Sequence, residues 1–171
     1  MNTFKCFLFC ASALAATGCG GGSAAGQAVA RIADDTSELT KLRRATERFR
    51  SIDDAVAAGY PASIPKCIAH AEHGAMGFHH TNRALLDGKL EVQRPEILIY
   101  ERMADGSYVL NGVEYIVPYS VLPRDATPPV ILGQTLKRSD SLELWYLHVW
   151  IFKENANGMF ADWHPDVECR S

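Results

Sequence analysis

Apolar residues recur every three or four positions between residues 39 and 56, which is the period of an amphipathic helix. Thr36 or Ser37 is expected to cap its start, because a hydroxyl oxygen there accepts a backbone hydrogen bond. Ser51, followed three residues later by Asp54, predicts a second cap within the segment. The face expected to be buried consists of Leu39, Leu42, Ala45, Thr46, Phe49, Ile52 and Val56.

Alternating patterns typical of strands begin after Pro95. The predicted strands cover residues 96–101, 107–119, 130–132 and 141–153. Asp105-Gly106 and Asn111-Gly112 predict tight turns, because these residue pairs tolerate positive φ. Residues 62–94 have no clear period and predict a loop with short helical turns. We therefore expect an α+β domain in which an N-terminal helix packs on a mostly antiparallel sheet of about four to five strands.

The N-terminus has the layout of a secretory signal peptide. Lys5 precedes an apolar run over residues 6–17, which is shorter than the roughly 20 residues of a membrane-spanning helix. Ala16-Thr17-Gly18-Cys19 resembles a lipobox, the bacterial motif in which the cysteine receives diacylglycerol. We predict a signal peptide over residues 1–18 and lipidation at Cys19. Leu, Val or Ile is more usual in the place of Ala16, so cleavage by an ordinary signal peptidase is the alternative.

The expected organisation is a tethered single domain. Residues 20–26 are Gly, Ser and Ala, so residues 19–35 are predicted to form a flexible lipidated tether, followed by one α+β domain over residues 36–171. The lipid would hold the chain to a membrane of the cell envelope, on its periplasmic side or at the cell surface. The formal net charge of −3 includes no basic block, which gives no indication of nucleic-acid binding.

Five cysteines divide into those used by export and those left in the domain. Cys6 and Cys10 lie in the predicted signal peptide and Cys19 is assigned to the lipid, which leaves Cys67 and Cys169. An even remainder in an exported chain favours a disulfide, because the compartment is oxidising. Two unpaired buried thiols or a metal-binding cysteine pair are the alternatives.

Histidines supply the candidate chemistry, because imidazole binds metals and titrates near neutral pH. His79 stands in a glycine-rich segment predicted as a loop, and His148 stands in the middle of the last strand. Glu114 lies between β-branched and aromatic neighbours, so an inward-facing carboxylate there would need a partner. The remaining histidines near the loop are expected at the surface: His70, His73 and His80.

Two imidazoles and a carboxylate predict a metal site with open positions for water or substrate. Its predicted ligands are His79, His148 and Glu114, and Glu101 and His164 are additional candidates. The ion would be a divalent or transition metal; zinc, copper, iron and manganese all suit these ligands. The alternative is a core His148 satisfied by hydrogen bonds, a solvent-facing Glu114 and a His79 that caps a turn.

Short sequence blocks within residues 45–170 carry a further indication. They include Met76-Gly77-Phe78-His79, Pro95-Glu96, Tyr100-Glu101, Val113-Glu114-Tyr115, Leu147-His148-Val149-Trp150 and residues 158–169. These blocks are similar to a family of secreted bacterial proteins and lipoproteins without an established function. The resemblance implies export and a disulfide, and its pattern includes His79, Glu114, His148 and the two remaining cysteines. Asn is more usual where this chain has His164.

Two functions from different classes follow. In the first, the chain is a metal-binding envelope lipoprotein with hydrolytic or oxidative chemistry, in which Glu114 binds the ion or acts as a base. In the second, it is a non-catalytic domain with structural histidines that binds an envelope partner or a small apolar ligand. No nucleophile-elbow motif supports catalysis by serine, and the sequence does not identify the small-molecule or protein partner.

Overall fold

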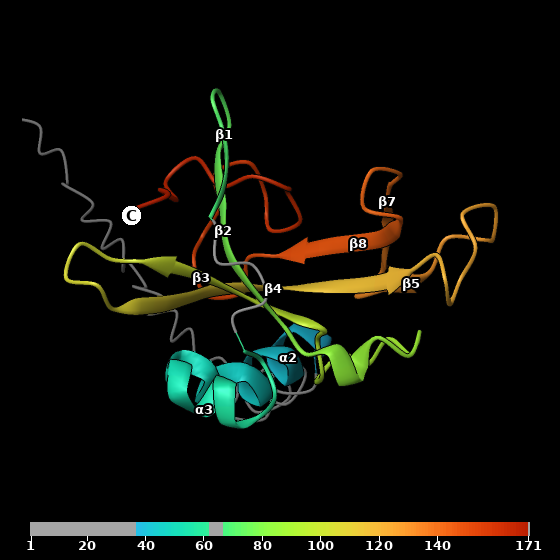
Figure 1. The fold of residues 1–171 in the computed structure, drawn as a ribbon, viewed down its shortest axis with the longest axis horizontal. Helices are drawn as coiled ribbons and strands as arrows, with labels where there is room; N and C mark the ends of the chain where they lie inside the picture. Colours follow the sequence, from blue (N-terminus) through green and yellow to red (C-terminus); the bar gives the residue numbers. More distant parts are fainter. Residues whose placement is uncertain (1–36, 62–66, 171) are drawn as a thin grey trace, which may run out of the picture.

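The computed structural model describes residues 37–61 and 67–170 (Figure 1). The predicted signal peptide, the lipidation site Cys19 and the tether over residues 19–35 lie outside the described residues. Within the part of the chain that the structure describes, no helix has the length and apolar character needed to cross a membrane.

Two short helices and a 3-10 turn make the helical layer: α2 spans Glu38–Thr46, η1 spans Glu47–Arg50 and α3 spans Ile52–Ala57. Both predicted caps are confirmed. The Ser37 side chain accepts a hydrogen bond from the Thr40 backbone N–H at 3.1 Å, and Ser51 accepts one from Asp54 at 3.2 Å. The extended backbone of Ser51 divides the predicted helix in two.

A curled antiparallel sheet of six strands has the order β1-β2-β3-β4-β8-β7. Its strands are β1 Ile68–His70, β2 Gly74–Thr81, β3 Ile97–Arg102, β4 Tyr108–Pro118, β7 Lys137–Ser139 and β8 Leu144–Val149. Two short strands, β5 Val130–Ile131 and β6 Gln134–Thr135, pair separately. The predicted mixture of helix and antiparallel sheet is confirmed. The sheet is larger than expected, and the helix begins at residue 38 rather than at the N-terminus of the chain.

Strand β2 occupies a segment that was expected to be a loop. Its side chains are buried on both faces, with Phe78 and His80 on one side and His79 on the other, so no alternation of polarity appears in the sequence. Gly77 has φ +88°, and a Cβ there would lie 2.4 Å from the Tyr100 carbonyl oxygen. The glycines that suggested a loop therefore permit close packing of strands.

The turn expected at Asn111-Gly112 is a β-bulge within the continuous strand β4. Ile99 of β3 pairs with Gly112, whereas the next residue, Tyr100, pairs with Leu110. Asn111 is therefore the extra residue, and a bulge of this kind bends the strand without ending it. A Cβ on Gly112 would lie 2.5 Å from a carbonyl oxygen of the chain leaving β8, so the close approach of these strands requires glycine.

Both faces of the sheet are covered (Figure 1). The core between the helices and the sheet includes Leu42 and Phe49 from the helices and Leu98, Tyr100, Tyr115 and Leu147 from the strands. The opposite face carries a smaller cluster formed by Ala75, Ile97, Ile99, Ile116, Trp150 and Val167. The C-terminal tail folds over this second face, where His164 pairs with Ala75. A disulfide between Cys67 and Cys169, with a Cα–Cα distance of 5.3 Å, joins the tail to β1 and confirms the predicted pairing.

Candidate metal centre

Strand register brings the predicted ligands to the sheet face opposite the helices. His79 of β2 pairs with Ile99 of β3, Ile97 pairs with Glu114 of β4, and Glu114 pairs with His148 of β8. Paired residues project from the same face of a sheet, and so do residues two positions apart on one strand. The three side chains therefore share one face, and the curl of the sheet brings His79 across β3 towards the other two.

Three ligand atoms converge in the protein interior. The Nε2 atoms of His79 and His148 lie 3.4 Å apart. The Glu114 carboxylate lies 3.6 Å from the first through Oε2 and 3.7 Å from the second through Oε1. The exposed fractions of the residues are 3% for His79, 7% for Glu114 and 2% for His148. These three residues form a buried group that could hold a metal ion, and we call it the His-Glu-His group.

The spacing of the two imidazoles matches a shared ion. Nitrogen ligands at about 2.0–2.1 Å from a tetrahedral ion are about 3.3–3.4 Å from each other. The Glu114 carboxylate makes no hydrogen bond to the described residues, because its distances to the imidazoles exceed the usual range for one. A buried carboxylate without hydrogen bonds is costly unless a cation lies beside it.

Burial also sets the protonation of the group. Burial, followed by the adjacent His148 ring, lowers the pKa of His79 to about 3, so this imidazole is neutral at physiological pH. Burial raises the pKa of Glu114, and the neighbouring His148 opposes this shift. A neutral imidazole provides the nitrogen lone pair that a metal ion requires.

Asp162, in the C-terminal tail, is a further residue at the site that the sequence pattern did not indicate. Its Oδ1 atom lies 3.8 Å from Nδ1 of His148 and 2.6 Å from Nζ of Lys137, and its Oδ2 atom lies 3.4 Å from the Tyr146 hydroxyl. Burial opposes its ionisation, but His148 and Lys137 hold the pKa of Asp162 at about 2. Carboxylates behind metal-binding histidines orient the ring and increase its basicity. The 3.8 Å separation is too long for a hydrogen bond, and Nδ1 of His148 has no hydrogen-bond partner among the described residues, so Asp162 acts on His148 through its negative charge.

The two additional ligand candidates lie apart from the His-Glu-His group. Glu101 accepts hydrogen bonds from Asn111, the extra residue of the bulge, at 2.9 Å and from Lys153 at 2.8 Å. The His164 ring contacts the Glu154 carbonyl oxygen at 3.0 Å. Local partners therefore satisfy both side chains, and neither belongs to the group of potential ligands found in the described residues.

The other histidines differ in burial. His70 and His73 are exposed, as expected, and their rings stack with centroids 4.3 Å apart. His80 was expected at the surface but is buried, with 3% of it exposed. Alternation along β2 places it opposite His79, on the helix side, where its Nδ1 atom lies 3.2 Å from the Tyr60 carbonyl oxygen. The assignment of β2 as a loop caused this error.

A cavity of about 300 Å³ opens beside the His-Glu-His group. Its other lining residues are mainly aliphatic: Ile68, Met76, Thr81, Ile97, Ile116, Ser139, Leu142, Leu144 and Tyr146. The side chains of β2, β4 and β8 thus place potential metal ligands next to space for a small molecule.

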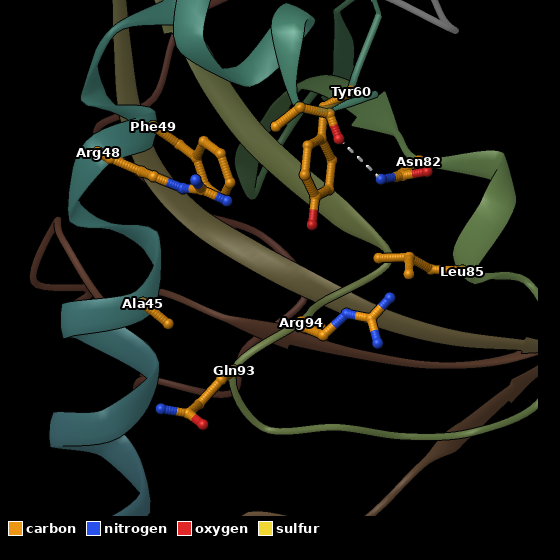
Figure 2. Close-up of a pocket in the computed structure, with 9 residues that line it drawn as sticks. Ala45, Arg48, Phe49, Tyr60, Asn82, Leu85, Gln93 and Arg94 are labelled. Atoms are coloured by element: carbon orange, nitrogen blue, oxygen red, sulfur yellow. Dashed lines mark hydrogen bonds between the residues drawn. The ribbon is translucent and has the colours of Figure 1, made fainter.

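Another hollow, of about 140 Å³, lies on the helix side of the molecule (Figure 2). Arg48 on η1 and Arg94 in the segment before β3 are among its lining residues, and both are exposed to solvent. Asn82 on its wall donates a hydrogen bond to the Ala58 carbonyl oxygen at 3.2 Å. None of its lining residues belongs to the His-Glu-His group, so the cavity on the opposite face is the better functional candidate.

Comparison with known proteins found no matching family model, curated protein or solved structure. The resemblance to a secreted bacterial family therefore stays a prediction. A function for this protein is therefore inferred from the geometry of the His-Glu-His group and of the cavity beside it.

Proposed function

We propose that this protein is an exported domain that binds one metal ion through His79, Glu114 and His148. The observation that supports this most strongly is the convergence of three buried ligand groups from three strands. The two imidazole Nε2 atoms lie 3.4 Å apart, and each lies 3.6–3.7 Å from a different oxygen of the Glu114 carboxylate. Three protein ligands leave a position open for water or another molecule, as in catalytic zinc sites, whereas structural sites are closed by four protein ligands. The adjacent cavity gives access to that open position.

Zinc is the proposed ion. Two imidazoles and a carboxylate are the ligands of both zinc hydrolases and non-haem iron(II) oxygenases. Adjacent ligands of an octahedral ion would be about 3.0 Å apart at a bond length of about 2.1 Å, whereas tetrahedral ligands are about 3.4 Å apart. The 3.4 Å separation of the His79 and His148 nitrogens supports a tetrahedral ion. Zinc bound in this way lowers the pKa of a bound water and polarises a carbonyl group.

Export with lipid attachment at Cys19 belongs to the same proposal. The signal-like N-terminus and the glycine-rich segment after Cys19 support it, and a disulfide is compatible with an oxidising compartment. A mature N-terminal peptide that begins at Cys19 and carries a diacylglycerol mass would agree with the proposal. A mature chain that begins elsewhere without lipid would contradict the attachment.

Metal analysis of the purified protein tests the proposed site. We expect one equivalent of zinc per chain in the wild type and less than about a tenth of that in His148→Ala, because two ligands cannot retain the ion. His70→Ala is the matched control, since His70 is an exposed histidine, and it should keep the full equivalent.

A folded wild type that binds no zinc when zinc is supplied would contradict the proposal. The 3.4 Å contact between His79 and His148 would then be a hydrogen bond with a shared proton, and the histidines would have a structural role. Circular dichroism of His148→Ala distinguishes loss of the ion from loss of the fold.

A further inference from the structure

We infer that the cavity beside the metal group binds a small apolar molecule that ends in a single negatively charged oxygen group, as a short-chain monocarboxylate does. This inference rests on the proposed metal site, because the ion would receive the charged end. The small molecule would occupy the open position on that ion.

The walls of the cavity favour an apolar body. Ile97 pairs directly with Glu114, and Ile116 lies two residues further along β4 on the same face. Leu144 of β8 and Met76 of β2 add apolar surface from either side. No lysine or arginine lines the cavity within the described residues, so a second charged group on the ligand would have no partner there.

The charges of the site favour a bound molecule with a single negative charge at the end that contacts the ion. A divalent ion beside the Glu114 carboxylate and two neutral imidazoles leaves a net charge of about +1. Asp162 does not cancel this charge, because Lys137 pairs with it at 2.6 Å. A ligand group with a single negative charge would neutralise the buried site, whereas an ammonium group would add to its charge.

The mouth of the cavity extends the apolar path to the surface. Leu142 lines the cavity and is nevertheless 68% exposed, in the turn between β7 and β8. Asp140 anchors this turn through an ion pair with Arg124 at 2.7 Å. A large apolar side chain held at a cavity mouth gains burial when the apolar end of a ligand covers it.

Cobalt(II) substitution tests the metal and the ligand separately. Tetrahedral cobalt(II) has visible d–d absorption bands that shift when a new oxygen ligand binds. We expect hexanoate to shift these bands and to bind at least tenfold more tightly than acetate, because each buried methylene group increases affinity about fourfold. Hexylamine and succinate should bind at least tenfold more weakly than hexanoate, because the first is cationic and the second carries two negative charges.

Two variants test the path through the cavity mouth. Leu142→Asp should weaken hexanoate binding at least fivefold and leave the cobalt bands of the ligand-free protein unchanged. Val130→Asp is the matched control, because Val130 is 63% exposed and does not line the cavity. It should bind hexanoate as the wild type does.

The outcomes distinguish the two proposals. A folded wild type without tetrahedral cobalt bands would overturn the metal site and, with it, the ligand assignment. Cobalt bands that respond equally to acetate and hexanoate, or that respond to hexylamine or succinate as strongly as to hexanoate, would overturn the ligand assignment alone. Equal hexanoate affinities of Leu142→Asp and Val130→Asp would also overturn the ligand assignment alone.

Discussion

Among the single residues of this protein, Glu114 shows most directly why the His-Glu-His group could hold a cation. Its carboxylate is 7% exposed and has two imidazole nitrogens as polar neighbours at 3.6 and 3.7 Å, beyond hydrogen-bonding distance. Burial without a hydrogen bond favours the protonated acid, and this is the direction in which the pKa of Glu114 shifts. A cation beside the carboxylate would oppose that preference, which agrees with the proposed metal site.

Replacement of Asp162 tests its role behind His148. Asp162→Asn removes the negative charge 3.8 Å from Nδ1 of His148, and we expect zinc affinity to fall by about 10- to 100-fold. Competition with a chromogenic chelator measures the change. Asp125→Asn is the control, because Asp125 is an exposed aspartate that does not line the cavity, and it should leave zinc affinity unchanged. Equal affinities of the two variants would exclude a positioning role for Asp162.

At the scale of elements, the contact between β3 and β4 includes a buried carboxylate outside the metal group. Glu96, immediately before β3, is 1% exposed and accepts a hydrogen bond from the Ile116 backbone N–H at 3.2 Å. Burial raises the pKa of Glu96 from 4.5 to about 8, and the hydrogen bond from the Ile116 backbone N–H opposes the shift. The folded protein therefore holds this proton more tightly than the unfolded chain does.

The resulting pH dependence of stability has a definite sign. Because the pKa of Glu96 is raised on folding, its protonation stabilises the folded state fully below pH 4.5, and this contribution is lost as the pH rises towards about 8. Relative to Glu96→Gln, the metal-free wild type should lose up to about 4 kcal/mol of unfolding free energy between pH 5 and pH 9. Urea denaturation of both proteins at the two pH values measures the difference. A difference that does not vary with pH would contradict the shift.

The whole molecule depends on the return of the C-terminal tail to the second face of the sheet. The Cys67–Cys169 disulfide links positions 102 residues apart and holds this tail, which also carries Asp162. We expect Cys67→Ser/Cys169→Ser to lose roughly 2–5 kcal/mol of unfolding free energy in denaturant titrations. Reduced wild type should behave like the variant, and a loss below about 1 kcal/mol would show that packing alone holds the tail.

The sequence alone determined features that depend on neighbouring residues. The caps at Ser37 and Ser51 follow from hydroxyl side chains that accept bonds from backbone N–H groups three residues away. Counting cysteines predicted the pairing of Cys67 with Cys169, because the predicted signal peptide and lipidation site account for the other three cysteines. The candidates His79, Glu114 and His148 were also found locally, from their residue types and apolar neighbours.

Tertiary structure decided how these candidates meet. Burial of β2 on both faces removed the polarity pattern that would have identified it as a strand, and the prediction therefore placed the buried His80 at the surface. Asn111, the extra residue of the bulge, donates a hydrogen bond to Glu101, and the returning tail brought Asp162 to His148. The strand register, the curl of the sheet and the folding of the C-terminal tail over the sheet all depend on contacts between residues that are distant in the sequence. The sequence therefore identified the candidate ligands by residue type, and only the folded sheet defined their geometry and the cavity beside them.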